Sequence, residues 1–303
     1  MSRQEKIFIF GAGYSGKAFA DANSAIGAAI FGTTRSPEKF EPLSRAGIAP
    51  LLFDGTLTPE IEAALGQTTH LVISIAPDEA GDPVLNAARA AIAGKMPALK
   101  WIGYLSTVGV YGDHGGGWVD EKAECRPVSR RSVMRLIAEQ AWLTLGRELG
   151  LPVAVLRLSG IYGLGRNAFV NLTNGTAKRL VKQGQVFNRI HRDDIGGALR
   201  HLAERNRGGV FNITDDFPAP PQDVVAYAAA LMGVEPPPEI PFETAELSPM
   251  ARSFYGENKR VANAAIKADG YRFLFPDYRS ALERMWADDT WNDGEARSPI
   301  KRS

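Results

Sequence analysis

The sequence predicts an α/β fold in which a doubly wound parallel sheet carries a smaller C-terminal lobe. Three observations support this prediction. Short, unbroken apolar runs recur between residues 7 and 105, as expected of strands that are buried on both faces. Segments with helix-start signals separate these runs, which gives the β-α-β alternation of a parallel sheet with right-handed crossovers. A glycine-rich turn also joins the first run to the first helix.

The expected elements follow from these patterns in chain order. Strands are expected at residues 7–10, 28–33, 51–53, 71–75 and 100–105. Helices are expected to start at Ser15 or Gly16, near Ser36, at Pro59 and at Pro83, and a further proline-led helix after residue 216. Thr58 is a typical N-cap, because its hydroxyl can accept a hydrogen bond from a helix N–H group, and proline is tolerated at the first helical position.

The turn after the first strand contains Gly11, Gly13 and Gly16 in the spacing G-x-G-x-x-G. Between a strand and a helix, such glycines permit a tight turn, close approach of a pyrophosphate and close packing of the helix on the strand. The diphosphate of a dinucleotide would bind to backbone N–H groups at the positive end of the helix dipole. The turn, including Tyr14 and Ser15, is therefore predicted to bind a dinucleotide in a Rossmann-type domain. The alternative is a purely structural turn.

The end of the second strand predicts which dinucleotide binds. A site for NAD usually places Asp or Glu about 20 residues past the glycines, where it binds the ribose hydroxyls. This chain has Thr34, Arg35 and Ser36 instead. A guanidinium flanked by hydroxyls can bind a 2'-phosphate through charge-assisted hydrogen bonds, so the sequence favours NADP over NAD. Alternatively, Arg35 is a solvated loop charge.

Three more residues are expected to contact the cofactor because of where they follow the strands. Asp54 comes directly after the third strand, and Ala76 and Pro77 come after the fourth. Doubly wound sheets bind ligands outside the carboxyl ends of their strands, which is where these residues would lie.

The composition limits the classes of partner. Net charge is +1, with 35 basic and 34 acidic residues, so no global field attracts nucleic acid or an anionic membrane, and a small-molecule substrate is expected. The single cysteine, Cys125, excludes an internal disulfide and fits a reducing cytoplasm. No signal peptide or membrane span is recognisable, and the histidines show no metal-ligand spacing. The expectation is a cytoplasmic protein without a metal site.

Four segments resemble motifs of one known family. They are residues 104–112, YLSTVGVYG; residues 155–166, VLRLSGIYGLGR; residues 190–195, IHRDDI; and residues 210–215, VFNITD. In this order and spacing they are similar to the extended short-chain dehydrogenase/reductases, a superfamily that includes nucleotide-sugar epimerases and dehydratases. The resemblance implies a sixth and a seventh strand in the second and fourth segments, and NAD(P)-dependent oxidoreductase or epimerase chemistry. Phe10 replaces the first glycine of the family's usual G-x-x-G-x-x-G, which indicates an atypical member.

The resemblance also implies a division into two domains. The dinucleotide-binding domain would comprise residues 1–165 and 187–214, and the smaller substrate lobe residues 166–186 and 215–303. A homodimer formed through a pair of helices is implied as well.

In this family a serine or threonine, a tyrosine, and a lysine four residues after the tyrosine carry the chemistry. By position, Thr107 matches the first role and would hydrogen-bond the substrate oxygen, unless it is a hydroxyl satisfied at a strand end. Arg131 and Arg135 stand where the tyrosine and the lysine are expected. Arginine is not deprotonated in proteins, so Arg131 cannot be a general acid or base, whereas Arg135 could still hold ribose or phosphate. Together the two arginines favour an anionic substrate, unless both are solvated helix charges.

The missing tyrosine leaves the proton donor open. Asp82 falls where the family has an asparagine, and water, Asp82 or Tyr104 could supply the proton; the alternative for Asp82 is a helix cap before Pro83. A Tyr-x-x-x-Lys spacing at Tyr255 and Lys259 lies far from the expected helix and is interpreted as accidental. Two functions remain. One is an NADP-dependent oxidoreductase or epimerase-like enzyme acting on a small polar carbonyl or sugar-derived substrate, and the other is a catalytically silent NADP-binding sensor or regulator.

Overall fold

A computed structural model describes residues 5–24 and 27–294, and its chain divides into two compact units. Unit 1 comprises Met1–Val110, Pro127–Leu158 and Ile195–Ile213, and unit 2 comprises Tyr111–Arg126, Ser159–Asp194 and Thr214–Ser303. Residues 111–126, 159–165, 187–194 and 214 therefore fall in unit 2, whereas the sequence expectation places them in the dinucleotide-binding domain.

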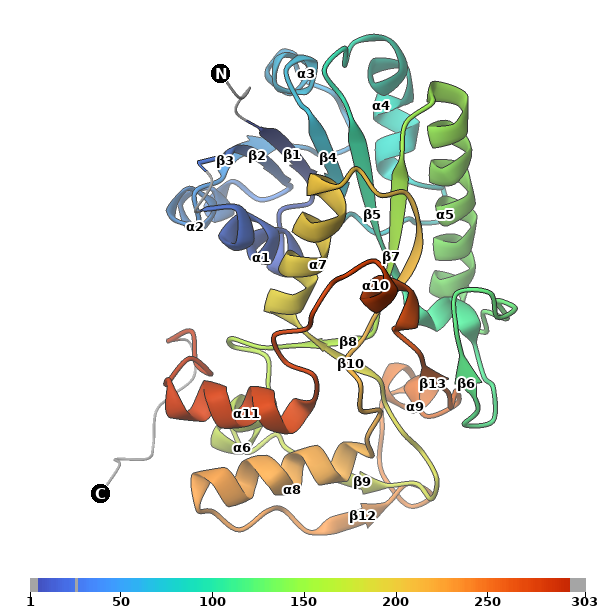
Figure 1. The fold of residues 1–303 in the computed structure, drawn as a ribbon. Helices are drawn as coiled ribbons and strands as arrows, with labels where there is room; N and C mark the ends of the chain where they lie inside the picture. The colour runs from blue at the N-terminus through green and yellow to red at the C-terminus, as the bar shows by residue number, and fades with distance from the viewer. Residues whose placement is uncertain (1–4, 25–26, 295–303) are drawn as a thin grey trace. The chain divides into compact units, whose positions relative to one another are not determined.

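Unit 1 is built on a seven-stranded sheet with the order β11-β7-β5-β4-β1-β2-β3 (Figure 1). The strands are β1 (Lys6–Phe10), β2 (Ala29–Thr34), β3 (Ala49–Leu52), β4 (His70–Ile73), β5 (Trp101–Thr107), β7 (Val153–Leu158) and β11 (Gly209–Ile213). Every neighbouring pair in this sheet is parallel. The predicted doubly wound parallel sheet is confirmed, and the strand order reverses between β1 and β4.

Helices cover both faces of this sheet (Figure 1). They are α1 (Tyr14–Asn23), α2 (Phe40–Arg45), α3 (Pro59–Gly66), α4 (Pro83–Gly94), α5 (Arg130–Leu149) and α7 (Arg192–Glu204, in unit 1 from Ile195 on), with the 3-10 helices η2 (Pro37–Lys39) and η3 (Val108–Tyr111). Apolar side chains of α3, α4 and α5 form one core with β1, β4, β5 and β7. On the other face α7 packs closely on α1, because Gly196 has no Cβ that would overlap the carbonyl of Ala18.

Helix starts in unit 1 follow the local sequence signals. Thr58 caps α3 by accepting a hydrogen bond from the Ile61 N–H at 3.4 Å, and a proline occupies the first position of both α3 and α4. Ser129 caps α5 by accepting from the Ser132 N–H at 3.2 Å, and α5 ends at Gly150, whose φ of 65° is left-handed.

Unit 2 consists of short parallel strand pairs and helices. The pairs are β8 (Gly160–Tyr162) with β10 (Arg189–His191), β9 (Arg179–Val181) with β12 (Glu239–Pro241), and β6 (Trp118–Val119) with β13 (Arg260–Val261). The helices are α6 (Ala168–Thr173), α8 (Pro221–Met232), α9 (Pro249–Phe254), α10 (Ala264–Ala268) and α11 (Tyr278–Ala287). Phe169, Tyr278, Leu282 and Met285 anchor its main core, which joins α6, α8 and α11.

Within the described part of the chain, no helix has both the length and the apolar character needed to cross a membrane.

Candidate functional site

The glycine turn lies at the carboxyl end of β1, beside the point where the strand order reverses. Gly11 has a left-handed φ of +82°, and a Cβ at this position would lie 2.8 Å from Cγ1 of Ile75 and 3.2 Å from its backbone N. A Cβ on Gly16 would lie 3.2 Å from Cγ2 of Ile9. The first and third glycines are therefore required by backbone conformation and by the close approach of α1 to β1.

Backbone hydrogen bonds fix the shape of this turn. The Gly11 N–H donates to Oγ1 of Thr33 at 2.9 Å, the Ala12 N–H donates to the Thr33 carbonyl at 2.8 Å, and the Gly13 N–H donates to the Gly11 carbonyl at 2.7 Å. Gly13 is the N-cap of α1, where no side chain makes a capping hydrogen bond and no acid stands in the first turn. No acidic side chain in the first turn thus opposes an anion at the positive end of the α1 dipole, and the glycine turn with the start of α1 fits the diphosphate of a dinucleotide.

The residues expected at the ribose end lie where β2 ends. Oγ1 of Thr34 accepts a hydrogen bond from the Ser36 N–H at 3.2 Å. Ser36 starts the 3-10 helix η2 without a capping bond from its own side chain. Arg35 is exposed, and among the described residues no acidic group pairs with it. Asp54 is also exposed and accepts a hydrogen bond from the Thr56 N–H at 3.1 Å.

The segment after β4 runs next to the glycine turn. The Ser74 N–H donates to the Phe10 carbonyl at 2.8 Å, and Ile75 contacts Gly11. Ala76 follows as an exposed residue, and Pro77 is buried. The structure therefore brings this segment to the same edge of the sheet as the glycine turn.

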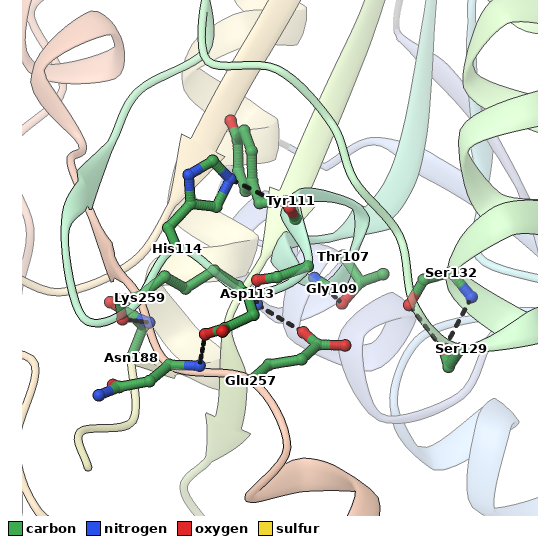
Figure 2. Close-up of polar contacts among 12 residues, drawn as sticks. Thr107, Gly109, Tyr111, Asp113, His114, Ser129, Ser132, Asn188, Glu257 and Lys259 are labelled. Atoms are coloured by element: carbon green, nitrogen blue, oxygen red, sulfur yellow. Dashed lines mark hydrogen bonds and ion pairs between the residues drawn. The ribbon is translucent and has the colours of Figure 1, made fainter.

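Thr107 ends β5, with its side chain half-buried. Its Oγ1 accepts a hydrogen bond from the Gly109 N–H at 3.1 Å, and Ser132 of α5 lies beside Gly109, with Ser129 hydrogen-bonded to Ser132 (Figure 2). The strand-end hydrogen bond is thus present. In this hydrogen bond the Thr107 hydroxyl is the acceptor. Its own proton has no acceptor among the described residues, so Thr107 can donate a hydrogen bond to a ligand.

The two arginines on α5 differ in their surroundings. Nη1 of Arg135 donates to the Leu105 carbonyl at 2.6 Å and to the Tyr104 hydroxyl at 3.3 Å, and the guanidinium lies 5.6 Å from the centre of the Tyr104 ring. Arg131 is exposed on the first turn of the helix. Arg135 is therefore held against β5, whereas Arg131 faces solvent.

Tyr104 is poorly placed to supply a proton. Its side chain is fully buried, and its ring stacks on Trp142 with the centroids 6.2 Å apart. Burial raises the pKa of the Tyr104 hydroxyl above its usual value, so the phenol stays protonated and shielded from ligands. The geometry does not support the proton-donor hypothesis for Tyr104.

Asp82 is a buried helix cap. Its Oδ1 accepts hydrogen bonds from the N–H groups of Val84 at 2.9 Å and Leu85 at 3.0 Å, and its Oδ2 accepts from Nε1 of Trp142 at 3.0 Å. Burial raises the pKa of the Asp82 carboxyl, although these hydrogen bonds and the charge of Arg135 act in the opposite direction. Since both oxygens already hold the start of α4 and anchor α5, the geometry favours the capping alternative.

Two features of this region were not foreseen from the sequence. Glu139 is fully buried and pairs with Arg157, whose Nη2 lies 2.7 Å from Oε2, while Ser106 donates to Oε1 of the same carboxylate. Ser132 is also buried, and its Oγ accepts a hydrogen bond from Oγ of Ser129 at 2.9 Å. The helix-cap position of Ser129 is the one sequence signal that pointed to this second cluster.

Tyr255 and Lys259 do not share a helix. Tyr255 follows the end of α9, and Nζ of Lys259 donates to the Gly112 carbonyl at 2.7 Å and to Oε2 of Glu257 at 2.6 Å, within unit 2 (Figure 2). Lys259 thus connects two loops of unit 2 by hydrogen bonds. In the described ranges no group of three or more His, Cys, Asp or Glu residues is arranged to hold a metal ion.

The comparisons with known proteins give the family. No protein-family model matches the chain, and no curated protein matches it. Among solved structures, a functionally unknown conserved protein from Silicibacter pomeroyi DSS is 45% identical, with a TM-score of 0.85 over 93% of this chain and 98% of that chain. A putative NAD-dependent epimerase/dehydratase from Methylobacillus flagellatus is 24% identical, with a TM-score of 0.70 over 95% of this chain and 99% of that chain.

A human epimerase family protein, solved with NADPH, is 20% identical, with a TM-score of 0.71 over 93% of this chain and 99% of that chain. These likenesses agree with the parallel sheet described above. The chain therefore belongs to the family of the Silicibacter pomeroyi protein, and it shares its fold with the putative epimerase/dehydratase and with the epimerase family protein.

Proposed function

We propose that this chain is an NADP-dependent oxidoreductase or epimerase-like enzyme that acts on a small polar carbonyl or sugar-derived substrate. The observation that carries the proposal is the glycine turn at the start of α1, with an exposed Arg35 in place of an acid at the end of β2. A carboxylate at that position would repel a 2'-phosphate, whereas Arg35, Thr34 and Ser36 offer a cation and two hydroxyls.

The residues of unit 1 divide the work of binding. When bound, NADPH supplies a hydride. Backbone N–H groups in the first turn of α1 hold the diphosphate, and Arg35 holds the 2'-phosphate. Thr107 donates its hydroxyl proton in a hydrogen bond to the substrate oxygen. Arg135 is engaged by the Leu105 carbonyl and positions α5 on β5.

A second function, a catalytically silent NADP-binding sensor or regulator, has its own supporting observation. Neither a tyrosine nor a lysine stands on the first turns of α5, and arginines occupy both positions. Guanidinium groups do not exchange protons near neutral pH, so the usual acid-base pair of the superfamily is missing.

A turnover assay with a cofactor-binding control separates the two functions. NADPH binding is measured by its fluorescence, and NADPH oxidation by its absorbance with a panel of sugars, aldehydes, ketones and the dicarbonyl phenanthrenequinone. Steady oxidation that falls in Thr107→Val supports the enzyme. Tight NADPH binding without turnover on any carbonyl contradicts it and favours the sensor.

Three further expectations belong to this proposal. An anionic substrate is expected from the exposed Arg131, and paired assays of glyceraldehyde and glyceraldehyde phosphate would test it. A homodimer is expected from the resemblance, and light scattering of the purified chain would test it. A cytoplasmic location, without nucleic-acid or membrane partners, is expected from the charge balance and the single cysteine.

A further inference from the structure

A second hydroxyl lies beside Thr107 at the carboxyl end of β5. A Cβ built on Gly109 would lie 2.8 Å from Oγ of Ser132 and 3.4 Å from Oγ1 of Thr107. Both hydroxyls therefore pack close to Gly109 and to each other, and they can do so because residue 109 has no side chain. Gly109 is not among the residues with positive φ, so close approach, rather than backbone conformation, is what requires a glycine here.

The hydroxyl groups of Ser132 and Thr107 both accept a hydrogen bond beside Gly109. Oγ of Ser132 accepts a hydrogen bond from Oγ of Ser129 at 2.9 Å, and Oγ1 of Thr107 accepts from the Gly109 N–H at 3.1 Å. Among the described residues, neither Ser132 nor Thr107 has an acceptor for its own hydroxyl proton. Each hydroxyl can therefore donate one hydrogen bond to a ligand oxygen near Gly109.

The position of α5 supports these donors. Ser129 is the N-cap of α5, and its Oγ accepts from the Ser132 N–H at 3.2 Å, so Ser132 is fixed through both its backbone and its side chain. Capping explains the bond to the backbone. It does not explain why Oγ of the buried Ser132 lies against Gly109. Ser132 directly follows Arg131, which stands where the superfamily has its tyrosine.

We propose, on the basis of the function proposed above, that Ser132 is a catalytic residue that binds the substrate carbonyl oxygen together with Thr107. When bound, NADPH would supply a hydride to the carbonyl carbon and would leave as NADP⁺. Ser132 and Thr107 stabilise by hydrogen bonds the negative charge that develops on the oxygen as the π electron pair of the C–O bond moves onto it. The oxygen takes one proton from water, so the carbonyl becomes an alcohol. Ser129 is a positioning residue that orients the Ser132 hydroxyl.

The test compares Ser132→Ala, Ser132→Thr and Gly109→Ala with a matched control, Thr144→Ala, which removes a hydroxyl from the far end of the same helix. The readouts are the dissociation constant of NADPH, and kcat and KM with phenanthrenequinone and methylglyoxal. Removing one donor to a developing oxyanion typically lowers kcat by about a hundredfold or more. We expect that loss for Ser132→Ala and for Gly109→Ala, whose methyl group would displace the Ser132 hydroxyl. NADPH affinity should stay within about twofold, a free-energy change below ~0.5 kcal/mol.

Ser132→Thr keeps a hydroxyl and should recover a substantial part of kcat, whereas a merely structural role predicts no such rescue. If wild type turns over and Ser132→Ala and Gly109→Ala keep the wild-type kcat, this inference is overturned and the proposed function stands. If wild type binds NADPH but reduces neither carbonyl, the proposed function is overturned and the inference with it. Should Ser132→Ala fail to fold, Gly109→Ala and Ser132→Thr decide by the same criteria.

Discussion

Three buried carboxylates differ in their partners: Glu139 in unit 1, and Asp194 and Asp215 in unit 2. In unit 1 Glu139 is fully buried but paired with Arg157 and hydrogen-bonded by Ser106. In unit 2 Asp194 and Asp215 are equally buried, yet neither forms an ion pair among the described residues. Asp194 accepts hydrogen bonds from the hydroxyl of Tyr271 and from two backbone N–H groups, whereas Oδ2 of Asp215 has no partner.

This difference in partners has a different consequence for each carboxylate. Glu139 links α5 to β5 and β7, the elements next to Thr107 and Ser132, so its ion pair fixes the geometry of the candidate site. In unit 2 burial raises the pKa of Asp194 to about 6 and that of Asp215 to about 8. Glu139 is thus a buried carboxylate with an ion-pair partner, whereas Asp194 and Asp215 are buried carboxylates that titrate close to neutral pH.

The largest expected effect comes from breaking the pair in unit 1. Glu139→Ala leaves the buried Arg157 without its carboxylate, and removing one partner of a buried pair typically costs about 3–5 kcal/mol in unfolding free energy. Urea denaturation followed by circular dichroism measures this loss. Glu148→Ala is the matched control, because its pair with Arg89 is exposed and worth about 0–1 kcal/mol. Equal effects in the two variants would show that the buried pair of Glu139 with Arg157 contributes no more to stability than an exposed pair.

The second largest loss of stability is expected for Asp82→Ala. It removes the cap of α4 and leaves Nε1 of the buried Trp142 without an acceptor, which together should cost about 2–4 kcal/mol of stability. NADPH turnover should persist at a temperature where the variant is folded. Loss of turnover with unchanged stability would instead give Asp82 a role in proton transfer.

Asp215→Asn tests the titrating groups of unit 2. The raised pKa means that the folded state holds a proton that the unfolded state releases, so unfolding free energy falls as pH rises from about 4 to about 8. One proton gives a slope of at most ~1.4 kcal/mol per pH unit. Asparagine keeps the acceptor for the Phe217 N–H and cannot ionise, so the slope should flatten, most clearly between pH 6 and 8, above the pKa of about 6 for Asp194. An unchanged slope, measured by urea denaturation across pH, would contradict this.

The central sheet could be predicted from the sequence because its signal is local. Strands such as β1 and β4 are apolar runs, and the caps at Thr58 and Asp82 stand beside the helices that they start. The second strand was expected at residues 28–33 from the same local pattern, and β2 runs from Ala29 to Thr34, one residue later at each end.

The remaining features depend on contacts between residues that are distant in the chain. The residue types of Glu139 and Arg157 do not indicate that α5 and β7 bring them together. Residues 111–126 belong to unit 2 because β6 pairs with β13, near the other end of the chain. Tyr104 looked available as a proton donor, but its side chain is fully covered in the sheet, with Trp142 stacked on its ring. Ser132 was missed because a hydroxyl in the first turn of a helix resembles a capping group.

Parallel titrations with NADPH and NADH, followed by cofactor fluorescence, test the central claim of cofactor binding at the glycine turn most directly. Wild type should bind NADPH at least about tenfold more tightly than NADH, which corresponds to ~1.4 kcal/mol. Arg35→Asp should abolish this preference, whereas Arg147→Asp, the same charge reversal at an exposed position on α5, should keep it. Equal affinities in wild type would contradict the role of Arg35, and no binding of either cofactor at millimolar concentration would contradict the dinucleotide site itself.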